Sequence, residues 1–149
     1  MNQAQAIING AFELSALDSV DMGQVTHDVA LVEDADGNAV VGFKIVGKNS
    51  PEYVAANNQV RRENIKRASK RSKAIDASTD DGADAVARTV ENNERTVASA
   101  VVVGWFGFNL EGSPMNFDKA YVEKLLNKYP TWVQKVSNAL ENDANFMKV

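Results

Sequence analysis

The stretch that decides the fold is residues 25–46, VTHDVALVEDADGNAVVGFKIV. Residues 25–33 and 39–46 are rich in β-branched and apolar side chains, and DADGN lies between them. Asp, Gly and Asn tolerate the backbone conformations of tight hairpin loops, so the stretch predicts an antiparallel β-hairpin. A period of two places the apolar side chains of each strand on one face, namely Val29, Leu31, Val41, Phe43 and Ile45. Because a two-stranded hairpin is marginal by itself, we expect a helix to cover that face.

The first helix is predicted directly after the hairpin. Ser50 stands before Pro51 and Glu52, which is typical of an N-cap, a first helical position and an acid that complements the helix dipole. Nothing breaks the run before about Lys73. We therefore expect a helix over residues 51–73 and regard it as the cover of the hairpin.

A second helix is predicted to begin at the sequence STDD, residues 78–81. An amphipathic stripe follows, with valines at intervals of three to four residues and their multiples: Val86, Val90, Val97 and Val101. Residues 74–81 then form a short linker between two antiparallel helices. The helix is expected to give way to extended chain near Gly104.

The last third of the chain predicts an aromatic turn followed by a pair of helices. Residues 105–110 are aromatic and contain glycine, and the sequence EGSP at 111–114 indicates a turn. A helical face follows after Asp118. Pro130 disfavours helical geometry at Tyr129, so it ends one helix and begins the next.

These segments predict an α+β fold in a single domain spanning residues 1–149. Its parts are a β-hairpin or small sheet over 12–50, a helical region over 51–103, and the aromatic turn with its helical pair over 104–149. Residues 12–24, with Leu17, Asp18 and Ser19, are interpreted as a short strand or irregular lead-in.

The composition excludes several classes of protein. A chain of 149 residues with 44% hydrophobic content buries one modest core. Cysteine is absent, which excludes disulfides, thiolate catalysis and cysteine-ligated zinc. No apolar run approaches the ~20 residues of a transmembrane helix, and residues 1–8 lack the pattern of a signal peptide, so we expect no membrane partner.

Charge is distributed unevenly along the chain. Residues 1–50 carry a net charge of −5, residues 51–73 of +5 and residues 74–149 of −4, which sum to the overall −4. The positive segment contains Arg61, Arg62, Lys66, Arg67, Lys70, Arg71 and Lys73. It is interpreted as a solvated or partner-binding helix face, or as a surface that steers an acidic protein partner. Binding of nucleic acid is the remaining alternative, but no aromatic side chain is interleaved for stacking and the chain is acidic.

The candidate chemical groups have simple structural interpretations. His27 is the single histidine, and its neighbour Asp28 points to the opposite face of the predicted strand. Asp34, Asp36 and Asn38 resemble part of a calcium loop, yet the distal glutamate is missing and a hairpin turn explains them. The glycines follow no phosphate-binding spacing. We therefore predict a non-enzymatic protein with no catalytic, cofactor or metal site.

Aromatic side chains of the C-terminal third are interpreted as part of a small core or, where exposed, as a docking patch. They are Trp105, Phe106, Phe108, Phe117, Tyr121, Tyr129 and Trp132. The candidate partner-binding residues are the basic Arg61, Arg62, Lys66, Arg67 and Lys70 together with the aromatic Trp105, Phe117, Tyr129 and Trp132.

Several short motifs, spread over the chain, together resemble those of a known family of proteins. They are SPEY at 50–53, Gly104-Trp105, LEGSP at 110–114, Asn116-Phe117, VEKLL at 122–126, Tyr129-Pro130 and DANF at 143–146. In this order, with the acidic hairpin turn before them, they resemble tail assembly chaperones of long-tailed bacteriophages. The resemblance extends over roughly residues 12–147.

The resemblance implies an assembly role in the host cytoplasm. Such proteins bind the long helical tape-measure protein while the tail tube is built, and they are absent from the finished particle. Tape-measure and tail tube proteins are then the expected partners, with self-association as a further one, and an apolar helix would dock on the aromatic surface. The alternative is a structural virion protein, such as a decoration, head-tail connector or tail-associated subunit, which would stay in the virion.

Overall fold

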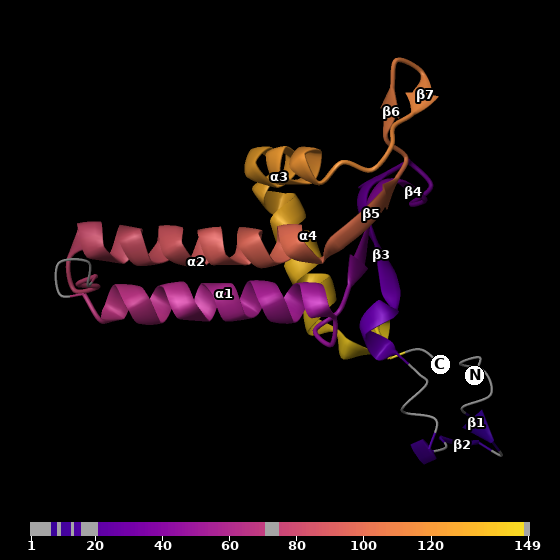
Figure 1. Cartoon of the computed structure of the whole chain (residues 1–149). Coiled ribbons are helices and arrows are strands. Elements are labelled where there is room, and N and C mark those ends of the chain that lie inside the picture. The colour runs from indigo at the N-terminus through magenta and orange to yellow at the C-terminus, as the bar shows by residue number, and fades with distance from the viewer. Residues whose placement is uncertain (1–6, 9, 13, 16–20, 71–74, 148–149) are drawn as a thin grey trace.

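The computed structural model describes residues 7–8, 10–12, 14–15, 21–70 and 75–147. It confirms a mixed α+β fold in which a three-stranded antiparallel sheet is joined to two long helices and a C-terminal helical pair (Figure 1). The elements in chain order are β1 Ile7–Ile8, β2 Ala11–Phe12, η3 Met22–Gln24, β3 Thr26–Glu33, β4 Ala39–Val46, α1 Pro51–Ala68, α2 Asp80–Val101, β5 Val102–Phe106, β6 Asn109–Leu110, β7 Ser113–Pro114, α3 Lys119–Lys128, α4 Pro130–Glu141 and η5 Asp143–Asn145.

The predicted hairpin is confirmed as β3 and β4, which pair antiparallel. Its turn is held by the Asp34 carboxylate, whose Oδ1 accepts the backbone N–H groups of Asp36 and Asn38 at 2.9 Å each. The hydrogen bond from the Asn38 backbone is the main reason why the pKa of Asp34 lies below its usual value of 3.8. Gly37 supplies the positive φ of 83° that closes the loop. The Asp34 side chain is thus a structural part of the turn.

A third strand, β5, extends the sheet beyond the predicted hairpin. It pairs antiparallel with β4, so that Trp105 lies opposite Phe43 and Gly104 opposite Lys44. The predicted change from helix to extended chain near Gly104 is confirmed and occurs at Val102, whereas the aromatic turn, expected from residue 104, begins only after Phe106. The helix α2 ends at Val101 because the β-branched residues that follow find backbone partners on β4.

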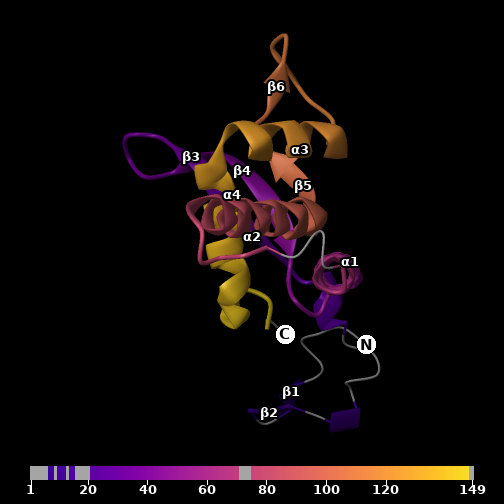
Figure 2. The same ribbon diagram turned by 90° about the vertical axis from the view of Figure 1, so that its left-hand side faces the viewer.

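The core lies between the sheet and the C-terminal helices. Val29, Leu31, Phe43 and Ile45 are buried on one face, as the period of two predicts. The expected cover, however, is corrected: α4 packs on β3 and α3 on β5, whereas α1 packs mainly on α2 (Figure 2). The covering helices contribute the buried side chains Val122, Leu126, Val133, Val136 and Leu140.

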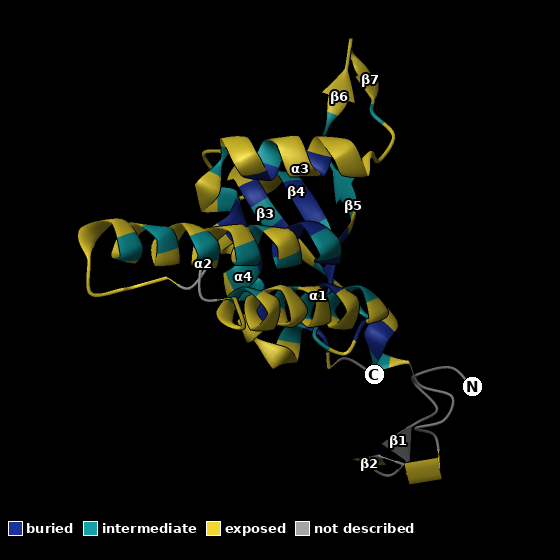
Figure 3. Ribbon diagram, turned by 60° about the vertical axis from the view of Figure 1, so that its left-hand side comes forward, coloured by how far each residue is buried: buried dark blue, intermediate teal, exposed yellow. Residues whose placement is uncertain are grey.

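The helices α1 and α2 lie side by side and antiparallel, as predicted, and together they project from the sheet (Figures 1 and 3). We call this helical pair the arm. Its buried residues are confined to the end near the sheet, namely Ala56 in α1 and Ala98, Ser99 and Val101 in α2. Val86 and Val90 of the predicted stripe are exposed. Most of the arm therefore has no third layer of structure over it.

The ends of the arm helices follow the sequence signals. Thr79 caps α2, and its Oγ1 accepts the Gly82 N–H at 2.9 Å. The first helix ends at Ala68, short of the predicted residue 73. Arg71, Lys73 and Ala74 lie outside the described residues, as do Leu17, Asp18 and Ser19 of the predicted lead-in. Of that lead-in, residues 22–24 form the short helix η3.

The hydrogen bonds of the Ser50 side chain at the start of α1 can be tested by substitution. Ser50 is fully buried; its Oγ accepts the Tyr53 N–H at 3.1 Å and donates to the Gly47 carbonyl at 2.6 Å. Ser50→Ala will lower the free energy of unfolding by about 1–2 kcal/mol, because the Tyr53 N–H loses its acceptor and the Gly47 carbonyl keeps only the Ser50 backbone N–H. Chemical denaturation measures the change. The matched variant Ser113→Ala, at an exposed position of β7, will leave the stability within about 0.5 kcal/mol of wild type, and equal effects of the two substitutions would contradict the capping role.

Candidate docking surfaces

The predicted basic residues lie on the outer half of α1, away from the sheet. Arg61, Arg62, Lys66 and Lys70 are exposed, and neither of the two salt bridges found among the described residues involves them. Arg67 is half-buried, and its Nη1 donates to Thr89 Oγ1 of α2 at 3.3 Å. This residue therefore helps to hold the arm together, and the others form a solvated basic face.

Because the arm helices are antiparallel, the acidic start of α2 lies at the same end of the arm as the basic outer half of α1 (Figure 1). Within residues 61–70, five bases and Glu63 give a net charge of +4. Within residues 75–91, five acids and Arg88 give −4. The excess of positive charge in the sequence is thus balanced by the neighbouring helix, which weakens the interpretation as a nucleic-acid surface.

Three of the predicted aromatic residues form one cluster at the end of β5. The ring of Trp105 lies 4.9 Å from that of Phe108 and 5.2 Å from that of Phe117. Its indole Nε1 donates to the Met115 carbonyl at 3.0 Å. Trp105 and Phe108 pack against the core, whereas 39% of the surface of Phe117 is exposed. The cluster therefore combines core anchors with an accessible ring.

Tyr129 and Trp132 form a separate pair at the junction of α3 and α4. Their rings are 4.5 Å apart, and Trp132 contacts Phe43 edge-on with the ring centroids at 6.1 Å. Trp132 is thus a core residue. Tyr129 is half-buried, and the Lys128 ammonium lies 5.3 Å from its ring. Of the four candidate aromatic residues, Trp105 and Trp132 thus pack against the core, Tyr129 is half-buried and Phe117 is exposed.

Near Phe117 the chain forms an open groove that the sequence analysis did not predict. Its volume is about 770 Å³. It is lined by Leu110 and by residues 113–119, and we call it the hairpin groove because β6 and β7 pair beside it. Glu111 and Gly112 have φ angles of 51° and 82°, which tighten the hairpin. Leu110, 58% exposed, and Tyr121, 42% exposed, add apolar surface close to Phe117 in the chain. A turn was predicted at 111–114, but strands of two residues are too short to give a periodic signal.

The structure does not bring the basic and aromatic candidates together. The basic residues belong to the outer half of the arm, whereas β5, the β6–β7 hairpin and α3 lie at its other end (Figure 1). The predicted partner-binding set thus separates into two surfaces, the outer arm and the hairpin groove.

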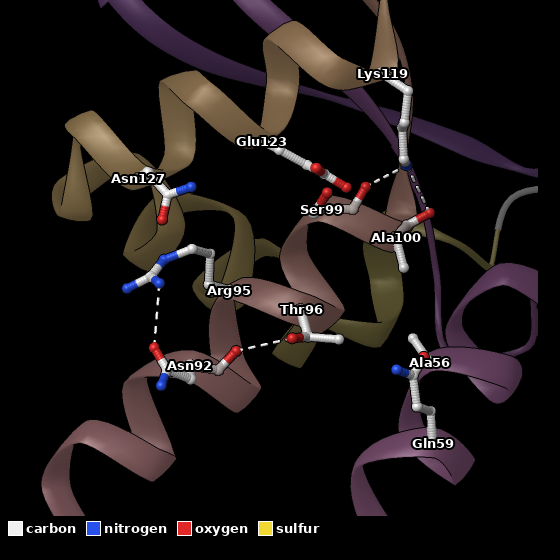
Figure 4. A pocket seen from close by; sticks show the side chains of 10 residues that line it. All are labelled: Ala56, Gln59, Asn92, Arg95, Thr96, Ser99, Ala100, Lys119, Glu123 and Asn127. Carbon is white, nitrogen blue, oxygen red and sulfur yellow. Dashed lines mark hydrogen bonds between the residues drawn. The ribbon is translucent and has the colours of Figure 1, made fainter.

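Lys119, at the first position of α3, is a cation with a structural role that sequence reasoning missed. Its Nζ donates to the carbonyls of Ser99, Ala100 at 3.1 Å and Val102 at 2.8 Å, at the end of α2. Figure 4 shows this side chain beside a polar groove of about 550 Å³ between α1, α2 and α3. The residue as a whole is exposed, but burial of its ammonium group lowers the pKa of Lys119 below the usual 10.5, against the opposing effect of Glu123 and Glu52.

The remaining sequence candidates lie apart from these surfaces. His27 is in β3, and its ring meets the edge of Phe146 at a centroid distance of 6.0 Å. Over the described ranges, no three His, Asp or Glu side chains are placed to hold a metal ion. In the same part of the chain, no helix combines the length and the apolar character that crossing a membrane requires.

In a comparison with known proteins, no family profile, no curated protein and no solved structure matches this chain. Function is therefore argued from the surfaces themselves.

The bonds of Lys119 predict a measurable contribution to stability. Lys119→Met keeps the aliphatic part of the side chain but leaves three carbonyls without their donor, so we expect the free energy of unfolding to fall by about 1–3 kcal/mol. Chemical denaturation followed by circular dichroism measures it. Lys70→Met is the control, because Lys70 is exposed and its side chain makes no hydrogen bond among the described residues. If Lys119→Met proved as harmless as this control, the hydrogen bonds of Lys119 to the three carbonyls would not contribute to stability.

Proposed function

We propose that the protein is a non-enzymatic tail assembly chaperone that binds a tape-measure protein while the tail tube is built. The observation that carries the proposal is the exposed Phe117 at the hairpin groove, with its ring against the anchored Trp105. The motif resemblance to tail assembly chaperones supports the same role. Tail tube proteins are further partners, and the host cytoplasm is the place of action.

The hairpin groove suits an apolar helix for a physical reason. Aromatic side chains supply a large contact area, and a rigid floor reduces the entropy lost on binding. The hydrogen bond between Trp105 Nε1 and the Met115 carbonyl fixes that floor. Exposed Leu110, Phe117 and Tyr121 then offer the apolar contacts that a helix-in-groove complex uses.

A chaperone of this kind also keeps its long apolar partner soluble, and the net charge of the chain supports this role. The chain carries −4, and its cationic arm segment is balanced by the acidic start of α2. Several copies on one tape-measure helix would therefore present an acidic coat, and such coats repel each other.

The decisive experiment is mass spectrometry of purified virions beside lysates of infected cells arrested during assembly. We expect the protein in lysate complexes with the tape-measure protein and not in virions. A stoichiometric amount in virions would overturn the chaperone role and indicate a structural subunit.

Binding by the hairpin groove is tested with Phe117→Ser combined with Tyr121→Ser. Because exposed aromatic residues carry much of the energy of protein interfaces, the double variant will weaken tape-measure binding at least about tenfold. Isothermal titration calorimetry with a tape-measure fragment measures the affinity. Val86→Ser removes an apolar side chain that is 38% exposed on the outer part of α2, at the other end of that helix from the groove (Figure 1), and it will keep wild-type affinity. Equal affinities of all three proteins would exclude the groove as the binding site.

A further inference from the structure

We infer that the arm binds a second copy of this chain, with the basic outer face of α1 in one copy docked on the acidic outer face of α2 in the next. The inference is independent of the proposed function, because it concerns only contacts between identical chains.

The outer face of α1 is basic with apolar residues among the charges. Residues that face α2 are identified by the Arg67–Thr89 hydrogen bond and by the half-buried Val60. On the opposite side of the helix, Arg62 and Lys66 are four residues apart and both exposed. Ile65, 67% exposed, lies between them in the chain. This face therefore offers positive charge and an apolar contact together.

The outer face of α2 is acidic over the same part of the arm. Asp84, Glu91 and Ala98 recur at intervals of seven residues, so they lie on one face of the helix. Near the sheet this face is covered, since Ala98 has no exposed surface. Farther out, Asp84, Glu91 and the adjacent Val90 are exposed, Val90 by 50%. The face that serves as core at one end of α2 is thus uncovered at the other (Figure 3).

A second copy fits both faces at once, which other partners do not. An acidic protein or a nucleic acid would match the α1 face alone and would leave Asp84, Glu91 and Val90 of the α2 face uncovered. The segments that contain these faces differ in sign: residues 61–70 carry a net charge of +4, and residues 75–91 carry −4, with the exposed Arg88 as the one base among the latter. Each also exposes an apolar side chain, Ile65 and Val90, that a neighbouring arm would cover.

The positions of the faces determine the kind of assembly. They belong to different helices and point away from each other, so one copy uses its α1 face and its neighbour uses the α2 face. Such a contact is heterologous, and it produces a ring or an open stack. Individual exposed ion pairs contribute little. Association therefore depends on the whole charged face and will be sensitive to salt.

Analytical ultracentrifugation of the purified chain tests the inference. At about 0.01 M salt, where the Debye length is about 30 Å, the mass average of the wild type will rise with concentration above that of a monomer; at about 1 M, where it is about 3 Å, the monomer will remain. Arg62→Glu with Lys66→Glu makes both faces acidic, and Asp84→Lys with Glu91→Lys makes both basic. Each double variant alone will be monomeric, and an equimolar mixture of the two will regain association.

Matched controls separate this result from general effects of charge. Lys124→Glu with Lys128→Glu produces the same charge change on α3 and will associate like the wild type, and circular dichroism will show unchanged helix content in all variants. A wild type that stays monomeric at low salt overturns the inference, even if the Arg62/Lys66 variant loses capture of an acidic partner. Failure of the mixture of folded variants to associate overturns it as well.

Discussion

The packing of Phe43 on the middle strand is the interaction on which the rest of the structure depends. Its side chain is completely buried, lies edge-on to Trp132 of α4 and stacks against Phe108 beyond β5. Trp105 is its partner across the β4–β5 ladder. Three segments that are far apart in the chain therefore share one core at this residue. A cavity left by a buried phenylalanine costs about 3–5 kcal/mol, a large part of the usual stability of a domain.

Local signals were sufficient to predict most elements but not their arrangement. Ser50, Thr79 and the Asp34 turn are side chains that bond their own neighbourhood, so their roles can be inferred from adjacent residues. The end of α2 could not be placed, because a run of valines suits either helix or strand until β4 supplies partners. Lys119 contacts carbonyls 17 to 20 residues earlier in the chain, and no spacing in the sequence indicates such a bond.

At the docking surfaces, too, the sequence did not predict which aromatic side chains are buried and which are exposed. Sequence identifies Trp105, Phe117 and Trp132 as large apolar groups, and two of them stabilise the core while the third is exposed. The difference comes from what covers each ring. Trp132 lies under the sheet through its contact with Phe43, whereas Phe117 lies in the segment before α3 beside an open groove. Burial of this kind is a property of the tertiary contacts and has no periodic signal in a segment as short as residues 115–118.

Separation of the two surfaces has a functional consequence for the proposed chaperone. The outer arm and the hairpin groove lie at opposite ends of α2, so a copy that contacts another copy through its arm keeps its groove free (Figure 1). Contacts between copies also raise the effective concentration of neighbouring grooves, which strengthens the hold on a long helical partner without any new contact to it. Because the arm contacts are electrostatic and the groove contacts apolar, salt weakens the first far more than the second. Assembly and release of such a coat would therefore be controlled at the arm.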